Sequence, residues 1–173
     1  MIIFDLDGTL ANCEHRRHFV DPEKNLNYLL ECCETNTYCN VHTGSKWKPD
    51  WDAFHETCDK DTPIKPVIDL FYTMQDIFIL DRIQIWSGRS ESVRQKTIDW
   101  LLKHASYDED IELKMRPIGD YTPDEQLKER WLDEVLSQGK TIEFVVDDRR
   151  KVVEMWRRRG VFVFDVNQSG KEF

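Results

Sequence analysis

The chain has 173 residues, of which 40% are hydrophobic and 33% charged, and its 33 acidic residues outnumber 24 basic ones for a net charge of −9. This length suits one compact domain with room for a modest insertion. The acidic balance excludes the diffuse positive field of a non-specific duplex binder, although nucleic acid can still bind locally. No apolar run approaches the roughly 20 residues needed to cross a bilayer, so we expect no membrane partner.

Four short apolar runs separated by helical patterns predict an α/β fold. The runs are typical of buried strands and cover residues 1–4, 83–86, 142–146 and 161–164. Apolar residues recur at helical spacing in the segments 66–80, 91–104 and 123–138. This alternation predicts a Rossmann-like parallel sheet with helices on both faces and a ligand crevice at the carboxyl ends of the strands.

The segment that follows the first strand breaks this alternation. It is polar, rich in Cys, Asn, Thr and Trp, and shows no clear strand pattern, although residues 23–34 and 51–58 are candidate short helices. Its place directly after the first strand would let it overhang the carboxyl end of the sheet. We therefore divide the chain into a core of residues 1–12 and 64–173 and an inserted cap, or lid, of residues 13–63.

The start of the chain and its cysteines indicate a reducing, cytoplasmic setting. The first residues, MIIFDLDG, lack the basic start and the small-residue cleavage site of a secretory signal. The cysteines are odd in number, and we expect thiols and no structural disulfide. They are Cys13, Cys32, Cys33, Cys39 and Cys58.

Acidic pairs end two of the predicted strands. Asp5 and Asp7 follow the first strand, and Asp147 and Asp148 follow a later one. The carboxyl ends of parallel strands share one edge of the sheet, which brings these four acids toward one crevice. Gathered carboxylates repel each other unless a cation offsets them, and hard oxygen ligands favour Mg²⁺. Helix capping explains the second pair taken alone, but not four acids at two strand ends.

Two further segments supply groups that suit a phosphate. The strand at 83–86 runs into Ser87, Gly88 and Arg89, which offer a hydroxyl, a close backbone approach and a forked guanidinium. Lys128 lies on a predicted helix and would balance the charge of a phosphate beside an aspartate nucleophile. Asp124, one turn earlier, is placed to orient that ammonium. A plain turn and a solvated lysine are the simpler interpretations of these segments.

These residues, in this order, resemble the four motifs of the haloacid dehalogenase superfamily: DLDGT at 5–9, Ser87, Lys128, and Asp147 with Asp148. Three longer stretches are similar to the 3'-phosphatase domain of phage polynucleotide kinase-phosphatase and its stand-alone phage relatives. They are IQIWSGRSES, MRPIGDYTPDEQLKERWL and FVVDDRRKVVEMWRRRGV. The resemblance spans nearly the whole chain except the insertion.

The resemblance implies a magnesium-dependent phosphatase. Asp5 would attack phosphorus to form an aspartyl-phosphate, while Asp7 would protonate the leaving oxygen and then activate water. The metal ligands it implies are Asp5, the backbone carbonyl of Asp7, Asp147 and Asp148. Ser87 and Lys128 would hold the phosphoryl oxygens. The family also matches Arg16, Arg89 and Asp124 as substrate-binding residues.

Two features bear on the substrate. The chain contains no G-x-x-x-x-G-K-[ST] loop, so we expect no ATP site and only the removal of phosphate. The insertion is longer than in the bifunctional relatives, and in this superfamily such an insertion selects the substrate. Three functions stay open: removal of 3'-phosphates from nucleic acid ends in repair, hydrolysis of nucleotides or small metabolites, and binding without catalysis. The intact acidic set argues against the third, and no pattern predicts an oligomeric state.

Residues of the insertion allow other interpretations. Cys39-x-x-His42 and His55-x-x-Cys58 have a spacing compatible with zinc, with Cys32 or Cys33 as alternatives, but they lack the framing turns of a zinc knuckle, which favours thiols without a metal. Trp47 and Trp51 are candidates for stacking on a base and equally for packing within the lid. Arg16 belongs to a basic cluster that suits substrate phosphates or the surface.

Overall fold

A five-stranded parallel sheet forms the centre of the protein. The computed structural model describes residues 1–35 and 47–167, with the backbone alone for residues 30–35. The strand order is β5-β4-β1-β6-β7, and every neighbouring pair is parallel. The strands are β1 (Ile2–Phe4), β4 (Ile83–Ser90), β5 (Glu112–Arg116), β6 (Phe144–Asp147) and β7 (Val163–Asp165).

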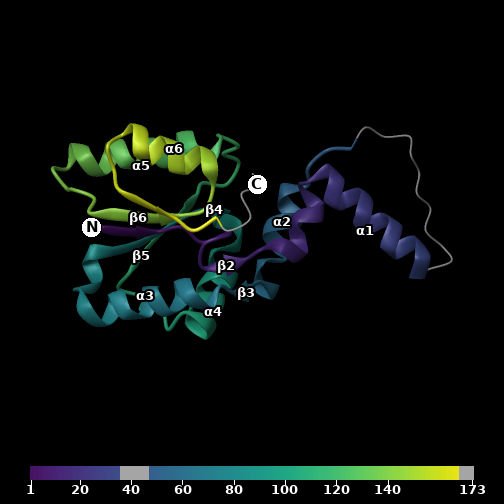
Figure 1. Ribbon diagram of the computed structural model, residues 1–173, viewed down its shortest axis with the longest axis horizontal. Helices are drawn as coiled ribbons and strands as arrows, with labels where there is room; N and C mark the ends of the chain where they lie inside the picture. Colours follow the sequence, from purple (N-terminus) through teal and green to yellow (C-terminus); the bar gives the residue numbers. More distant parts are fainter. Residues whose placement is uncertain (36–46, 168–173) are drawn as a thin grey trace.

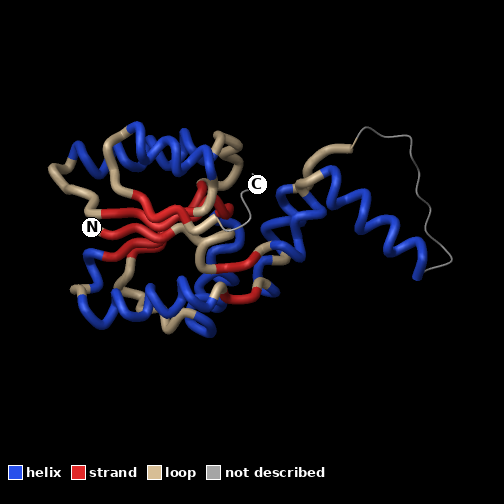
Figure 2. The backbone as a smooth tube through the Cα atoms, viewed as in Figure 1, coloured by secondary structure: helices blue, strands red, loops and turns tan. Residues whose placement is uncertain are grey.

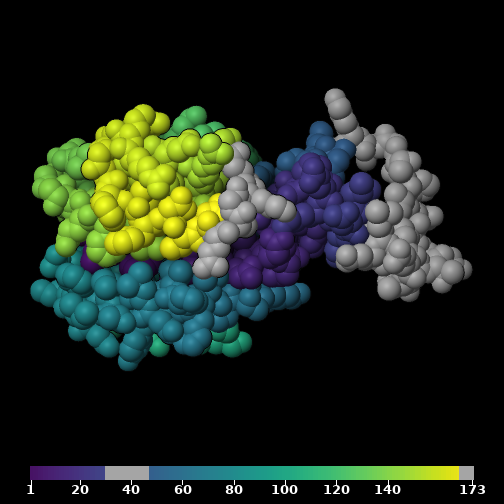
Figure 3. Space-filling model, viewed as in Figure 1, coloured from purple at the N-terminus to yellow at the C-terminus, as the bar shows by residue number. Residues whose placement is uncertain are grey.

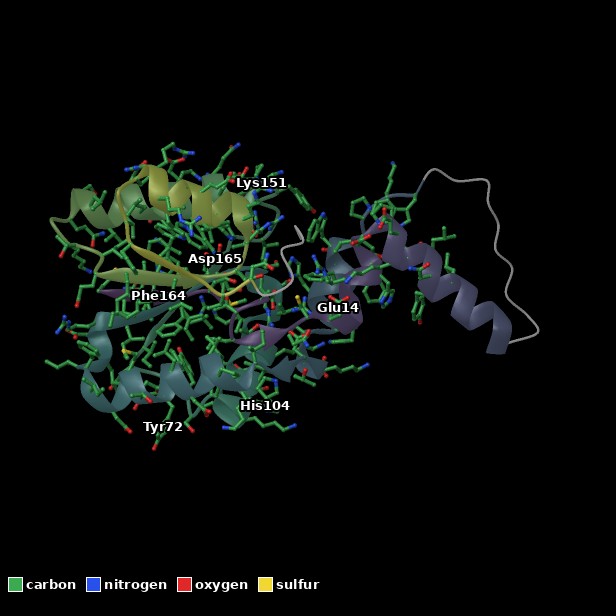
Figure 4. All side chains as sticks on the ribbon, in the orientation of Figure 1. Glu14, Tyr72, His104, Lys151, Phe164 and Asp165 are labelled. Atoms are coloured by element: carbon green, nitrogen blue, oxygen red, sulfur yellow. The ribbon has the colours of Figure 1, made fainter. Side chains whose placement is uncertain are left out.

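Two layers of helices enclose this sheet. Helices α3 (Lys65–Ile77) and α4 (Arg94–His104) cover one face, and α5 (Asp124–Ser137) and α6 (Arg150–Arg158) cover the other (Figure 1). Figure 2 shows the strands as a red layer between the two blue ones. In Figure 4, Lys151 labels the upper helical layer, and Tyr72 and His104 label the lower one.

Alternating side chains of the strands create a core on each face of the sheet. Ile2 and Phe4 of β1 pack with Phe71 of α3, while Ile3 between them packs with Trp86 and the α5–α6 layer. Successive side chains of a strand point to opposite faces, so an apolar run without interruption fills both cores. This explains why β1 has no polar residue among its three buried positions.

The route of the chain through the sheet places the crevice. From β1 the chain continues to β4 and β5 on one side, and it then returns to β6 and β7 on the other side. Phe4, the last residue of β1, is in register with Ile85 of β4 and Val146 of β6. In an open parallel sheet, ligands bind where the strand order reverses, at the carboxyl ends of the strands.

The segment after β1 lies beyond that end of the sheet. Strand β2 (Ala11–Asn12) pairs antiparallel with β3 (Thr62–Pro63), which holds the two ends of the segment side by side. Between them lie short 3-10 turns at Glu14–Phe19 and Cys58–Lys60, and the helices α1 (Pro22–Thr35) and α2 (Trp51–Glu56). Figures 1 and 3 show these purple and blue elements as a lobe beside the core, toward which the strands run.

The predicted α/β architecture with a parallel sheet is confirmed. Strand β5 was not predicted, because its sequence ELKMR alternates buried Leu113 and Met115 with polar residues and therefore has no continuous apolar run. Two predicted strands start late: β6 begins at Phe144 and β7 at Val163. Ile142 and Val161, where these strands were predicted to begin, pack against the core but lie outside the strands. No helix among the described residues is long and apolar enough to cross a bilayer.

Candidate active site

Three aspartates meet at the carboxyl ends of β1 and β6. Asp5 extends β1 by one residue, and its backbone N–H donates to the Val146 carbonyl at 2.9 Å. Asp147 ends β6 and Asp148 follows it. One carboxylate oxygen from each of Asp5, Asp147 and Asp148 lies within 4.8 Å of the others. Parallel pairing between adjacent strands is therefore what brings these distant residues together.

Lys128 of α5 supplies the positive charge beside this group. Its Nζ donates to Asp5 Oδ1 at 2.5 Å and to Asp147 Oδ2 at 2.8 Å. The side chain is buried, which by itself lowers the pKa of Lys128, but the charges of Asp147 and Asp5 outweigh burial and raise it above its ordinary value. The ammonium is therefore charged and donates hydrogen bonds to two carboxylates.

The three aspartates carry more negative charge than Lys128 can balance. Burial, with the charges of Asp147 and Asp148, raises the pKa of Asp5 well above its ordinary value. Burial and the charge of Asp147 likewise raise the pKa of Asp148 to about 7, although the Thr9 hydroxyl donates to its Oδ1 at 2.9 Å. A surplus of hard oxygen ligands with too little positive charge fits a divalent cation such as Mg²⁺.

Gly8 permits the backbone after Asp7 to approach this cluster closely. Its φ is +92°, in the left-handed region that glycine adopts readily. A Cβ atom at this position would also collide with the carboxylate of Asp148. Both the backbone conformation and the space beside Asp148 therefore require glycine between Asp7 and Thr9.

Asp7 belongs to a second cluster, which contains two buried arginines. Arg16 Nη2 lies 2.6 Å from Asp7 Oδ1, and Arg89 donates to the same oxygen through Nε at 2.9 Å and Nη2 at 2.5 Å. Both arginines have no exposed surface. Burial raises the pKa of Asp7, but the charges of Arg16 and Arg89 outweigh it and hold that pKa well below its usual range. The carboxylate of Asp7 is therefore ionised and fixed in position.

Asp61 completes this cluster and was not predicted from the sequence. Its carboxylate accepts hydrogen bonds from Arg16 Nε and Nη2, both at 2.7 Å, and from Arg89 Nη2 at 2.6 Å. Trp100 of α4 also donates to the Asp61 carbonyl at 2.7 Å. In the sequence, Asp61 does not follow a strand; it comes after the charged residues Asp59 and Lys60 and directly before β3. Its sequence context therefore carries no signal of a buried ion pair.

Ser87 and Gly88 lie where β4 leaves its regular pairing with β5. The register shifts between Ser87 and Ser90, and the buried Ser87 Oγ accepts from the Arg89 backbone N–H at 3.2 Å. A Cβ atom on Gly88 would lie 2.8 Å from an oxygen of Asp124. Close packing of this loop against α5 thus explains the glycine.

Asp124 is placed differently from the expected contact with Lys128. Its carboxylate accepts hydrogen bonds from Arg116 of β5 and from Arg149, which precedes α6. Lys128 instead donates to Asp5 and Asp147. Asp124 therefore connects β5 and the loop after β6, and a substrate-binding role for it stays a prediction.

A pocket of about 390 Å³ opens onto these clusters. Asp5, Asp7, Lys128 and Asp148 line it. Helix α2 of the insertion contributes one wall through Trp51, Asp52, Phe54 and His55, and the segment between β5 and α5 contributes the other. A concave site of this volume with a few convergent charged groups is typical of small-ligand binding.

The predicted site residues other than Ser87, Gly88 and Asp124 thus fall into two adjacent groups. Asp5, Asp147, Asp148 and Lys128 form the first, and Asp7, Arg16 and Arg89 form the second. Within the described residues, the side chains that could hold a metal are the three aspartates of the first group. The zinc hypothesis stays a prediction, because Cys39, His42 and the side chains of Cys32 and Cys33 lie outside the described residues. Trp47 is exposed, and Cys13 and Cys58 are buried free thiols.

Comparisons with known proteins agree with this geometry. A family model described as the polynucleotide kinase PNKP phosphatase domain matches residues 49–170. Two structures of the Pnkp1/Rnl/Hen1 complex, one of them described as an RNA repair complex, contain a similar chain with 25% identity and TM-scores of 0.64 and 0.65. They match 95% and 98% of this chain, which spans only 45% and 43% of theirs.

A more distant structure has the same fold. CbbY from Rhodobacter sphaeroides, in complex with phosphate, is 17% identical with a TM-score of 0.56, and the match covers 99% of this chain and 89% of that one. No match was found among curated proteins. Because the family model covers most of the chain, including Ser87, Lys128, Asp147 and Asp148, the chain belongs to the family of PNKP phosphatase domains, within the haloacid dehalogenase superfamily, and is a phosphatase.

Proposed function

We propose that this phosphatase is a magnesium-dependent phosphomonoester hydrolase that removes 3'-terminal phosphates from nucleic acid ends through an aspartyl-phosphate. The observation that carries the proposal is the position of Asp5. Asp5 directly follows the buried strand β1, its carboxylate lies beside Lys128 and the two later aspartates, and the residue lines the pocket. A nucleophile that faces a ligand pocket from within a cluster of charges has the arrangement that phosphoryl transfer requires.

Asp5 acts as the nucleophile in this mechanism. A carboxylate oxygen of Asp5 forms a bond to phosphorus while the bond from phosphorus to the leaving oxygen breaks. Lys128, which already donates to Asp5, holds a phosphoryl oxygen together with the hydroxyl of Ser87 and the backbone at Gly88. Positive charge and fixed donors around the phosphoryl group stabilise the charge that develops there.

Asp7 acts as the general acid and then as the general base. Because its carboxylate is ionised before substrate binds, Asp7 first takes up a proton from water as the anionic phosphate enters the site. It then gives this proton to the leaving oxygen in the first step, and in the second step it takes a proton from the water that hydrolyses the aspartyl-phosphate. Arg16 and Arg89 hold its carboxylate from two sides, at 2.6 Å and 2.5 Å. We assign the two arginines to this positioning in addition to the substrate contact that the family resemblance implies.

Asp5, Asp147, Asp148 and the backbone carbonyl of Asp7 would hold the Mg²⁺. The fit is supported by the surplus negative charge of three carboxylates, of which only Asp5 and Asp147 contact Lys128. When bound, the ion offsets the repulsion between the phosphate and these carboxylates.

We further propose that residues 13–63 act as a cap over the site. The pairing of β2 with β3 closes the segment at Asn12 and Thr62, next to the proposed boundaries. Helix α2 of this segment supplies Trp51 and His55 to one wall of the pocket. Arg16 and Asp61, also from this segment, contact Asp7 and Arg89, so the cap contributes to the catalytic cluster itself.

Family membership and the similarity to a chain of an RNA repair complex support the assignment to nucleic acid ends. We also propose a cytoplasmic setting, which the free thiols of Cys13 and Cys58 support. The deciding experiment compares magnesium-dependent phosphate release from a 3'-phosphorylated oligonucleotide with release from a panel of mononucleotides. We expect a higher kcat/KM for the oligonucleotide, and a preference for mononucleotides would overturn the assignment.

A nucleotidase is the second candidate, and one observation favours it. The pocket has a volume of about 390 Å³ and walls on two sides, which suits a single nucleotide. The same substrate panel decides between the two candidates, because a nucleotidase would lose activity as the nucleic acid chain attached to the phosphate grows longer.

A further inference from the structure

His55 is a buried histidine that the mechanism above does not use. It lies on α2 of the insertion with 8% of its surface exposed, and it lines the same pocket as Asp5 and Asp7. Among the described residues, the buried side-chain polar atom without a hydrogen-bond partner is Nδ1 of His55. Burying a polar group without a partner costs free energy. Because Nδ1 is enclosed, a contact between this ring and a ligand in the pocket has to go through Nε2.

The surroundings of His55 decide which ring nitrogen carries its proton. Burial lowers the pKa of His55 to about 4, and the positive charges of Arg16, Arg89 and Arg116 add to this effect against the opposing charge of Asp7. The ring is therefore neutral at physiological pH. A neutral imidazole carries one N–H, and no acceptor among the described residues lies at the enclosed Nδ1, so we place the proton on Nε2.

Helix α2 is also tied directly to the cluster around Asp7. Arg16 Nη1 donates to the Phe54 carbonyl at 3.0 Å, and the Arg16 guanidinium carbon lies 4.0 Å from the centre of the Phe54 ring. The same arginine contacts Asp7 at 2.6 Å. The position of His55, the residue after Phe54, is therefore fixed relative to the group that handles the leaving oxygen.

The pocket beside His55 has apolar and aromatic side chains on both walls. Trp51 lies on the same helix, with its ring centre 6.2 Å from that of His55, and the ring of Phe54 supports it edge to face at 5.7 Å. Ile118 and Tyr121, which line the pocket from the segment between β5 and α5, are 73% and 77% exposed. Flat aromatic surfaces around one polar donor suit a sugar and a base.

We propose that His55 is a specificity residue, whose Nε2–H donates a hydrogen bond to an oxygen of the sugar that carries the scissile phosphate, while Trp51 packs against the attached nucleoside. The inference rests on the proposed function, because it takes the leaving group to be a nucleoside. Asp7, at the leaving oxygen, is joined to α2 through Arg16, which contacts both Asp7 and the Phe54 carbonyl, so the sugar would lie beside this helix. A neutral donor suits this place, since the sugar has acceptor oxygens and no charge.

The test uses the ratio of two specificity constants. For each variant, kcat/KM is measured on a 3'-phosphorylated dinucleotide and on p-nitrophenyl phosphate, which has no sugar. We expect His55→Phe to lower the ratio of the first to the second by roughly 10-fold to 100-fold, because the hydrogen bond to the sugar is lost. Trp51→Ala should lower the ratio in the same direction.

Two amide variants distinguish recognition from packing. The amide nitrogen of Gln reaches the position of Nε2, whereas that of Asn reaches the position of Nδ1, so His55→Gln should retain more of the ratio than His55→Asn. Glu56→Gln serves as a matched control, since this neighbouring side chain is exposed and contacts Lys96 at the surface. Folding of every variant is checked by circular dichroism.

The outcomes separate this inference from the proposed function. An unchanged ratio in folded His55→Phe, or equal losses on both substrates, would overturn the role of His55 and leave the function standing. If the wild-type enzyme prefers mononucleotides but His55→Phe still lowers their ratio to p-nitrophenyl phosphate, nucleoside recognition is supported and the assignment to 3'-ends fails.

Discussion

The Nζ atom of Lys128 lies 2.5 Å from Oδ1 of Asp5, although 123 positions separate the two residues in the chain. The same ammonium also contacts Asp147 at 2.8 Å, so one lysine joins the end of β1, the end of β6 and the helix α5. This contact holds the proposed nucleophile in place, and it provides positive charge where a phosphoryl group would bind.

Replacement of Asp5 by Asn should lower kcat by more than about 1,000-fold on every substrate, because the nucleophile is lost. The fold should persist, since Lys128 keeps its contact with Asp147 and the amide has the same size. Phosphate release and circular dichroism test these two statements together. Activity near that of the wild type would contradict the proposed nucleophile.

Magnesium should stabilise the wild-type protein. The ion would relieve repulsion among Asp5, Asp147 and Asp148, and at a concentration 100 times its Kd we expect the Tm to rise by roughly 5–10 °C. Differential scanning fluorimetry measures this shift. Asp148→Asn should lose most of it, whereas Glu154→Gln, an exposed change on the following helix, should retain it. Equal shifts in both variants would argue against a metal at this cluster.

Replacement of Asp61 by Asn should impair both stability and catalysis. Arg16 and Arg89 would keep only Asp7 as a charged partner in a buried site, and we expect the free energy of unfolding to fall by about 3–5 kcal/mol. The looser hold on Asp7 should lower kcat more than it changes KM. Urea denaturation and steady-state kinetics measure the two effects.

The matched control for Asp61 is Asp69→Asn, which removes an exposed ion pair with Lys65. It should cost less than about 1 kcal/mol, because water screens exposed pairs. If Asp61→Asn is no more destabilising than this control, Asp61 does not hold the two arginines as we describe.

His55 should make the stability of the protein depend on pH. Burial lowers its pKa from 6.5 to about 4, so between these values the unfolded chain binds a proton that the folded protein does not. Stability is therefore lost as the pH falls from about 6.5 to 4, by roughly 3 kcal/mol from this residue. Denaturation at several pH values tests this, and His55→Phe should show a shallower loss than the wild type over the same range. Parallel curves would refute the depressed pKa.

Much of the fold and of the first cluster could be predicted from local patterns. Asp5 follows the apolar strand β1, Asp147 ends β6, and Ser87 follows the apolar run 83–86 that opens β4. In a parallel sheet the ends of adjacent strands lie at one edge, so the meeting of these residues follows from the alternation of strands and helices. Strand β5 escaped prediction because an edge strand with polar residues on one side has no such run.

The partners of each charged group could not be predicted in this way. Arg16 and Arg89 were expected to bind phosphate, and the structure pairs both of them with Asp7 and Asp61. A guanidinium suits a phosphate and a carboxylate equally well, so residue type alone leaves the partner open. Asp124 similarly contacts Arg116 and Arg149, from β5 and the loop after β6, and these are not its neighbours in sequence.

The sequence by itself therefore determined the parallel α/β core and the acidic residues at its strand ends, because both depend on short-range patterns of apolar and polar residues. Only the tertiary structure decided that the insertion returns Asp61 to the arginines and places His55 in the wall of the pocket. These contacts depend on the course of the insertion, in which α2 and the pairing of β2 with β3 return the chain to the end of the sheet. Such a course produces no periodic pattern of apolar and polar residues in the sequence.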